Sequence, residues 1–161
     1  PARAEFLSKS FGTVVEDEPL IGDVNDAAKK IHQKLKEIES STKPTAIVWG
    51  GETTVKIKGS GLGGRNQELA LIVAELAHQD PIRKSWTFLS GGTDGRDGPT
   101  EAAGAIVDQE TCKRILSEGY QVYDFLAENN SNKALKISND LLHTGATGTN
   151  VADVQILIVS Q

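Results

Sequence analysis

Residues 59–78 read GSGLGGRNQELALIVAELAH, a glycine-rich loop followed by a mostly apolar segment. The apolar positions of that segment surround most of a helical circumference, so we predict a helix over residues 66–78 that is buried on more than one side. The loop follows a β-branched run, and α/β folds place their ligand sites at such strand-to-helix turns. The stretch therefore predicts an α/β core with a candidate site at the start of this helix.

The rest of the chain alternates between expected strands and helices. Asp23 is a good N-cap for a helix over residues 24–39, in which apolar residues recur at helical spacing. Residues 40–44, SSTKP, break that helix and are the best candidate linker. The alternation predicts a layered α/β sandwich with a mixed, largely parallel sheet. The other expected elements are the end of a helix at 2–8, strands at 12–16, 46–49, 53–58, 86–89 and 105–107, a helix between Asp108 and Gly119, short helices at 122–127 and 132–137, and a strand at 154–159 that is buried on both faces.

The composition excludes several classes of protein. The chain has 161 residues, with 38% hydrophobic and 24% charged side chains, which is typical of one globular domain rather than of a disordered segment. Its apolar runs fall far short of the roughly 20 residues that cross a bilayer, so we expect no membrane partner. Its net charge of -5 opposes general binding to nucleic acid, so we expect no nucleic-acid partner. Cys112 stands alone in a helical pattern, which favours a buried thiol in a reducing compartment. We therefore predict a cytoplasmic location, with the mitochondrion as the alternative.

Most of the glycines gather in three windows, at residues 50–64, 91–98 and 145–148. The first window contains G-x-G-x-x-G at residues 59–64, but the ribose-binding acid of a dinucleotide site is missing, and a P-loop would need Lys-Ser or Lys-Thr where Arg65-Asn66 stands. Neither motif is therefore complete, but free backbone N–H groups at the start of a helix still favour binding of an anion. Arg65 adds a planar guanidinium that suits a phosphate or a carboxylate. The alternative is that these glycines only form tight turns.

The second and third windows carry polar side chains. Asp94 and Asp97 could hold Mg²⁺ or accept a proton from a hydroxyl group, and Arg96 could clamp a second anion. Asp-Gly pairs are also common turn formers, so the residue pattern alone leaves both interpretations open. Thr149 and Asn150 offer a hydroxyl and an amide that could line a polar substrate, or could form a turn that enters the last strand.

Four blocks of sequence, taken together, carry a resemblance to a known family. They are GGETTV at 50–55, GGRNQELA at 63–70, GTDG at 92–95 with DGPT at 97–100, and GTNV at 148–151 with Asp153. In this order they resemble the C-terminal domain of glycerate kinases that carry a MOFRL domain. The resemblance implies that residues 45–161 form a MOFRL-type C-terminal domain. Residues 1–44 are then the end of a preceding N-terminal domain, or a connecting helix and linker.

The family resemblance also implies an activity. Such an enzyme transfers phosphate from ATP, with Mg²⁺, to D-glycerate and gives 2-phosphoglycerate, in a cleft shared with the N-terminal domain of the same polypeptide. This chain alone would then be inactive, and the enzyme could form a homo-oligomer. Arg65 would clamp the glycerate carboxylate or the transferred phosphoryl group, and Asp94 would bind magnesium or orient the attacking hydroxyl. The remaining expected contacts are Gly63, Gly64, Asn66, Thr93, Arg96, Thr149 and Asn150 to substrate or phosphate, and Asp94 with Asp97 to the metal.

One departure from the family pattern bears on the metal. Residues 129–131 read Asn-Asn-Ser, where Asn-Asp-Ser is more usual, and Asn130 would weaken a magnesium site at that position. Two further hypotheses stay open. The first is a hydroxypyruvate reductase-type oxidoreductase, because the glycine loop resembles a dinucleotide-binding fingerprint, although the ribose-binding acid of that fingerprint is missing. The second is a ligand-binding module without catalysis.

Overall fold

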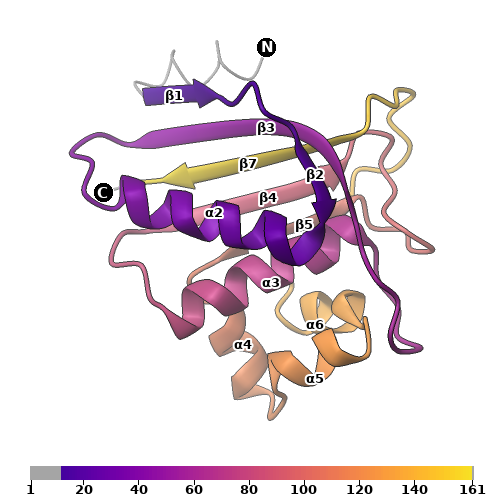
Figure 1. The fold of residues 1–161 in the computed structure, drawn as a ribbon. Coiled ribbons are helices and arrows are strands. Elements are labelled where there is room, and N and C mark those ends of the chain that lie inside the picture. Colours follow the sequence, from indigo (N-terminus) through magenta and orange to yellow (C-terminus); the bar gives the residue numbers. More distant parts are fainter. Residues whose placement is uncertain (1–11, 161) are drawn as a thin grey trace.

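A mixed seven-stranded sheet organises the molecule, and helices α2 and α3 lie on one of its faces (Figure 1). The computed structural model describes residues 12–160, so the helical end expected at residues 2–8 lies outside the described residues. The strands are β1 (Gly12–Val15), β2 (Leu20–Asp23), β3 (Thr45–Thr54), β4 (Trp86–Gly92), β5 (Gly104–Asp108), β6 (Leu141–Leu142) and β7 (Asp153–Val159). The helices are α2 (Val24–Ile38), α3 (Arg65–Gln79), α4 (Thr111–Ser117), α5 (Val122–Ala127) and α6 (Ser131–Ile137).

The order of strands across the sheet is β1-β3-β7-β4-β5-β6, and β2 also pairs with β3. The predicted α/β layering and the mixed sheet are confirmed, but the share of parallel pairing is lower than expected. Only the pairings of β1 and β2 with β3 are parallel. The reason is β7, which lies antiparallel between β3 and β4 and so separates two strands that point the same way.

Most helices follow the predictions from periodicity and capping closely. The exception is α4: Asp108 was expected to cap it, but the helix begins at Thr111 with Glu110 as its N-cap, and Asp108 Oδ1 accepts a hydrogen bond from the Glu110 N–H in the turn before it. Asp23 is the N-cap of α2, and its Oδ1 accepts a hydrogen bond of 2.9 Å from the backbone N–H of Asn25. Ile31 and Leu35 of α2 are fully buried in the same core as Leu69 and Leu71 of α3. α3 is buried around most of its circumference, as its apolar sequence predicts. This helix therefore packs between the sheet and its neighbouring helices.

β3 differs from its prediction as two strands at 46–49 and 53–58. The strand continues through Gly50 and Gly51 and ends at Thr54. Gly51 has a φ of +148°, and a Cβ at this position would lie 2.1 Å from the carbonyl oxygen of Leu20. The glycine therefore lets β2 approach β3 closely and does not turn the chain.

β7 is buried less than expected on one face. Asp153, Gln155, Leu157 and Val159 are buried, whereas the residues between them are half-buried, so burial alternates as in a strand that has one fully covered face. Within residues 12–160 we find no helix that is both long and apolar enough to span a membrane.

The expected boundary near residue 44 coincides with the loop between α2 and β3. In this structure, however, β1 and β2 belong to the same sheet as β3, and α2 belongs to the same core as α3. The assignment of residues 1–44 to a preceding domain stays a prediction.

Candidate functional site

The four sequence blocks meet at one edge of the sheet. This edge, here called the carboxyl edge, consists of the carboxyl ends of β3 and β4 and the amino end of β7, and lies on the right-hand side of Figure 1. Gly51 and Gly92 both lie opposite Asp153 in the strand register. The first residue of α3, Arg65, reaches the same carboxylate. Segments that are far apart in the chain therefore place their polar side chains where α/β folds bind ligands.

Arg65 binds two carboxylates of the carboxyl edge. Its Nε and Nη2 donate to Oδ2 and Oδ1 of Asp153 at 2.7 and 3.0 Å, and its Nη1 lies 3.1 Å from Oε1 of Glu52. The side chain of Asp153 is 0% exposed and that of Arg65 36%. The hydrogen bonding that Arg65 donates to Asp153 raises the pKa of Arg65, which therefore stays charged. In this structure the guanidinium acts first as the counter-ion of a buried acid.

Asp97 caps the N-terminus of α3. Its Oδ1 and Oδ2 accept hydrogen bonds from the backbone N–H groups of Asn66 and Gln67, at 3.0 and 2.9 Å, and from the side-chain amides of the same two residues. Burial raises the pKa of Asp97, and these hydrogen bonds oppose the shift. The expectation of free N–H groups at this helix start is therefore wrong for Asn66 and Gln67. Asp97 is 2% exposed, and both of its carboxylate oxygens accept hydrogen bonds from α3. This arrangement does not favour its predicted role as a metal ligand.

The side chain of Asn66 is also held inside the protein. It is 0% exposed, its Oδ1 accepts a hydrogen bond of 2.7 Å from Ser90, and its Nδ2 donates to Asp97. The predicted contact of Asn66 with substrate would need these bonds to open. Its place in the structure instead ties α3 to β4.

The glycine loop before α3 is packed against the segment between α5 and α6. The backbone N–H groups of Gly59, Gly61 and Leu62 donate to Asn129 Oδ1, to the carbonyl of Glu128 and to Asn130 Oδ1. A Cβ at Gly63 would lie 2.2 Å from Ser131 Oγ, and one at Gly64 would lie 2.4 Å from Asp97 Cγ. These glycines allow close packing of the backbone, and the three N–H groups are not free to cradle a phosphate.

The loop after β4 and the loop before β7 lie against each other. Thr93 Oγ1 donates to the carbonyl of Ala152 at 2.7 Å and accepts from the backbone N–H of Val151 at 2.9 Å. A Cβ at Gly95 would lie 1.9 Å from the carbonyl oxygen of Gly145, so no larger residue fits at this crossing. The hydroxyl of Thr93, predicted to contact substrate, thus joins the two loops.

Four of the predicted site residues are exposed on these two loops. They form what we call the loop surface: Asp94, Arg96, Thr149 and Asn150. Asp94 Oδ1 accepts a hydrogen bond of 3.0 Å from the backbone N–H of Arg96. Within residues 12–160 the Arg96 guanidinium has no hydrogen bond or ion pair. The loop surface therefore offers a free cation, a carboxylate, a hydroxyl and an amide.

These residues do not fit a self-contained magnesium site. The part of the chain that the structure describes contains no group of three or more His, Cys, Asp or Glu side chains that could hold a metal ion. Of the two predicted ligands, only Asp94 has an exposed carboxylate. Mg²⁺ in phosphoryl-transfer sites is held by one or two carboxylates together with substrate phosphates, so Asp94 alone supplies at most one such contact.

Comparison with known proteins assigns the family. Residues 45–153, about two thirds of the chain, match the MOFRL family. The chain belongs to the MOFRL family. The chain is 43% identical to the D-glycerate 2-kinase of Thermotoga maritima, over 98% of this chain and 38% of that protein. It is 40% identical to the glycerate kinase of Homo sapiens, over 98% of this chain and 32% of that protein.

Solved structures share the fold of this MOFRL chain. A crystal structure of glycerate kinase from Thermotoga maritima superposes with a TM-score of 0.92 and 41% identity, over 99% of this chain and 39% of that one. A protein from Pyrococcus horikoshii OT3 gives a TM-score of 0.87 with 39% identity, over 98% of this chain and 36% of that one. The resemblance read from the four blocks is confirmed. The chain spans about a third to two fifths of the length of these relatives.

Reasoning from the sequence assigned no role to several polar residues that organise the candidate site. Glu52 and Asp153 lie within the quoted blocks, yet only the structure shows that both bind Arg65. Gln67 donates to Asp97 and Thr100 and accepts from Asn132. One signal was available in the sequence: the N-cap of α3 is Gly64, which has no side chain to cap the helix, so another segment must supply the cap.

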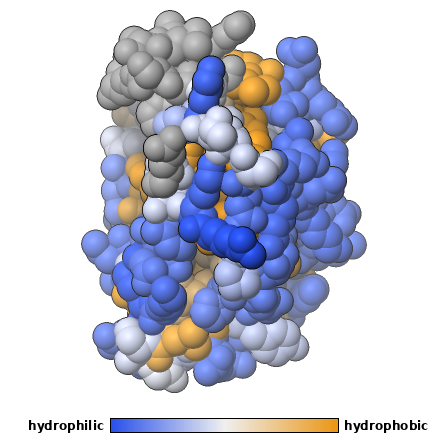
Figure 2. Space-filling model, turned by 90° about the vertical axis from the view of Figure 1, so that its left-hand side faces the viewer, coloured by the Kyte–Doolittle hydropathy of each residue, from blue (hydrophilic) through white to orange (hydrophobic). Residues whose placement is uncertain are grey.

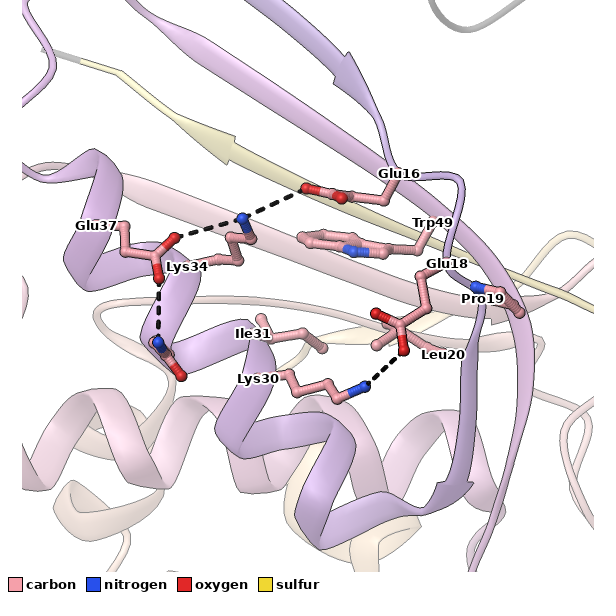
Figure 3. A pocket seen from close by; sticks show the side chains of 10 residues that line it. Glu16, Glu18, Pro19, Leu20, Lys30, Ile31, Lys34, Glu37 and Trp49 are labelled. Carbon is pink, nitrogen blue, oxygen red and sulfur yellow. Dashed lines mark hydrogen bonds and ion pairs between the residues drawn. The ribbon is translucent and has the colours of Figure 1, made fainter.

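The end of the molecule opposite the carboxyl edge shows fewer features of a ligand-binding site. Its surface is mostly hydrophilic, with apolar side chains in separate patches (Figure 2). A cavity of about 160 Å³ lies elsewhere, over the face of the sheet that α2 covers, between α2, the β1–β2 loop and Trp49 (Figure 3). The lysines at its rim are already paired, Lys34 with Glu16 and Glu37, and Lys30 with Glu18. Their charges are therefore not free for a ligand.

Proposed function

We propose that this chain is the C-terminal part of a glycerate kinase, which transfers phosphate from ATP to D-glycerate and gives 2-phosphoglycerate. In this proposal the carboxyl edge forms one wall of a cleft that the N-terminal domain completes. The observation that carries the proposal is the convergence of the four sequence blocks at this edge, in a fold that matches a glycerate kinase with a TM-score of 0.92.

The exposed loop surface is the part of this chain that we assign to substrate. Phosphoryl transfer depends mostly on positioning and on stabilising charge. Arg96 presents a planar fork that has no partner within residues 12–160 and that suits a carboxylate or a phosphate. Thr149 and Asn150, on the adjoining loop, add neutral hydrogen-bonding groups. Asp94 keeps Oδ2 free to accept a hydrogen bond from the attacking hydroxyl and so to orient it.

Arg65 receives a different role in this proposal from the one that the sequence predicts. Its guanidinium is shared between Asp153 and Glu52, so it fixes the ends of β3 and β7 relative to the start of α3. Mg²⁺ that accompanies ATP would neutralise phosphate charge, and Asp94 is the residue here that could approach it. We assign Arg65, Asp97 and Thr93 to holding the loops in place, with Gly63 and Gly64 providing the close packing that this needs.

The glycine loop gives no support to the reductase hypothesis. The dinucleotide fingerprint works by offering free N–H groups to a pyrophosphate, and those of Gly59, Gly61 and Leu62 are bound within the chain. The only sequence feature that favoured a reductase is therefore used for packing.

A coupled assay for ADP formation tests the proposed activity. It uses D-glycerate, ATP and Mg²⁺ with this chain alone, and with this chain joined to the part of the Thermotoga maritima enzyme that it does not cover. We expect ADP formation only with the longer protein, dependent on D-glycerate. A folded longer protein that binds D-glycerate without forming ADP would indicate a binding module. Oxidation of NADH by hydroxypyruvate would indicate a reductase.

Arg96→Gln should lower kcat/KM of the longer protein by about 10²- to 10³-fold, because it removes the unpaired cation from the loop surface. The melting temperature should not change, since the side chain has no partner within residues 12–160. Arg83→Gln is the matched control, because Arg83 is also exposed but lies away from the carboxyl edge. Steady-state kinetics and thermal unfolding of both variants measure the effects. Equal activities of the two variants would remove Arg96 from the site.

Location and assembly complete the proposal. Cys112 is a free, buried thiol whose pKa is raised to about 12 by burial, so it is kept as an unreactive apolar side chain. This supports a reducing compartment, and we propose the cytoplasm. A homo-oligomer is proposed from the family resemblance alone.

A further inference from the structure

A cavity of about 690 Å³ lies between the start of α2 and α3, and of the residues described at the candidate site only Asn129 lines it. Four parts of the chain surround it: the start of α2, the segment that follows β3, one face of α3, and α5 with Asn129. Neither Arg65 nor any residue of the loop surface lines it. Its volume is sufficient for a small metabolite.

Glu68 lies at the buried side of this cavity. The residue is 5% exposed, and its Oε1 accepts a hydrogen bond of 3.1 Å from Asn129 Nδ2. Within residues 12–160 it forms no ion pair. Burial raises the pKa of Glu68. Hydrogen bonding to Ser131 and Asn129 and the charge of Lys58 oppose the shift, and the charge of Asp97 adds to it. A buried carboxylate without a directly paired cation is costly, and such groups are concentrated at functional sites.

Asn129 fixes the wall that faces Glu68. Its Oδ1 accepts from the backbone N–H groups of Lys58 and Gly59 at 2.6 and 3.1 Å, and its Nδ2 also donates to the carbonyl of Lys56. Both the oxygen and the nitrogen of the Asn129 side-chain amide are therefore engaged in hydrogen bonds. Asn129 also has a φ of +51°, which few residues other than glycine adopt. These bonds hold the segment that carries Lys58 against the carboxylate of Glu68.

Lys58 supplies a cation at the mouth of the cavity, and its charge favours the ionised forms of Glu68 and Asp23 without a direct ion pair to either. Its side chain is exposed, and within residues 12–160 its ammonium has no hydrogen bond or ion pair, unlike the paired lysines around the smaller cavity of Figure 3. Half-buried apolar side chains of Val55, Ile72 and Leu126 form another part of the lining. Three more charged residues line the cavity: Asp23, Asp26 and Lys56, with the Lys56 ammonium 3.8 Å from Asp23 Oδ2. An acceptor at Glu68, a cation at Lys58 and an apolar wall thus lie around one space.

We propose that this cavity binds a small carboxylic acid that carries a hydroxyl or amino group on the carbon next to its carboxylate. Lys58 pairs with the carboxylate, Glu68 accepts a hydrogen bond from the neighbouring donor, and the apolar wall contacts the rest of the ligand. The shared chemistry admits a 2-hydroxy acid and a 2-amino acid. The site stands apart from the proposed kinase site and does not depend on it.

The stability of the unliganded chain should depend on pH through Glu68. Its pKa in the folded state is raised, so its contribution to stability is largest below the ordinary value of 4.5 and falls as the pH rises through the folded pKa. Glu68→Gln keeps an acceptor for Asn129 and removes the charge. We therefore expect this variant to be more stable than the parent at pH 7, with the difference vanishing near pH 4. Urea unfolding at both pH values measures it, and a parent that is the more stable at pH 7 would contradict the prediction.

Binding is tested by titrating this chain with glycine, L-alanine, D-lactate and D-glycerate, and following backbone and side-chain amide signals by NMR. At least one probe should give saturable shifts at Lys58, Gly59 and the Asn129 side chain. Lys58→Gln should weaken that binding about tenfold, as expected for loss of a charge-assisted hydrogen bond. Lys113→Gln changes the same charge at an exposed site on α4 and should have no effect.

Glu68→Gln distinguishes the two kinds of ligand. Affinity for an amino acid should fall about tenfold or more, because the ammonium loses its counter-charge, whereas a hydroxyl can still donate to the glutamine carbonyl. Shifts confined to Thr93–Arg96 and Thr149–Asn150 would mean that the probe binds the candidate kinase site, and would overturn the proposal. So would the absence of saturable shifts with all four probes at millimolar concentration, or binding that Lys58→Gln leaves unchanged.

Discussion

Arg65→Ala is expected to lower the free energy of unfolding by about 3–5 kcal/mol, because it leaves the fully buried carboxylate of Asp153 without its counter-ion. For a domain of this size, that corresponds to a fall in melting temperature of about 6–20 °C. Calorimetry or circular dichroism on the purified chain measures it. Loss of activity in this variant therefore has to be judged below its own melting temperature before Arg65 is given a catalytic role.

Two further variants separate the charge of Arg65 from its geometry. Arg65→Lys keeps the charge but loses the two-pronged contact with Asp153, so its loss of stability should be smaller. The double variant Arg65→Ala with Asp153→Ala should recover most of the stability lost by Arg65→Ala alone, since no buried charge is left unpaired. Arg65→Ala with an unchanged melting temperature would show that the ion pair is not structural.

Asp97→Ala is expected to cost about 2–4 kcal/mol of stability, through loss of the α3 cap and of the bonds to two buried amide side chains. Thermal unfolding should show a fall of about 4–16 °C. Asp94→Ala is the matched control, because it removes a carboxylate from the same loop at an exposed position. Its melting temperature should stay close to that of the parent.

The comparison between these two aspartates also tests their roles in the proposed kinase. If Asp97 bound a metal rather than α3, its loss would affect Mg²⁺-dependent activity more than stability. Equal stability of the Asp97→Ala and Asp94→Ala variants would contradict the capping role that the hydrogen bonds assign to Asp97.

Local signals were enough to predict the helices. The bounds of α2, α3 and α5 agree with the sequence within about a residue, because periodicity and caps such as Asp23 act over a few neighbouring residues. β3 was harder, since Gly50 and Gly51 look locally like a turn. Gly51 allows the close approach of Leu20 in β2, which is a contact between separate segments that single-sequence reasoning does not contain.

The same distinction holds for the candidate site. The sequence predicted site residues in several separate segments, and the structure brings those segments together at one edge of the sheet: Arg65, Asp94, Asp97, Thr93 and Asn150. Whether they form the site stays a prediction. The sequence could not say which of these side chains face solvent and which are bound inside the chain. That division depends on pairings such as Arg65 with Asp153 and Asp97 with α3, which join residues far apart in the sequence.

The position of β7 has a consequence for chain synthesis. Both of its neighbours, β3 and β4, precede it in the sequence, so a growing chain that has emerged only as far as β6 contains two half-sheets with no strand between them. Each half-sheet has an unpaired edge, which invites pairing with other chains, and non-local pairings of this kind form slowly. The nascent molecule is therefore exposed to aggregation, and in need of chaperones, until β7 enters and closes the sheet.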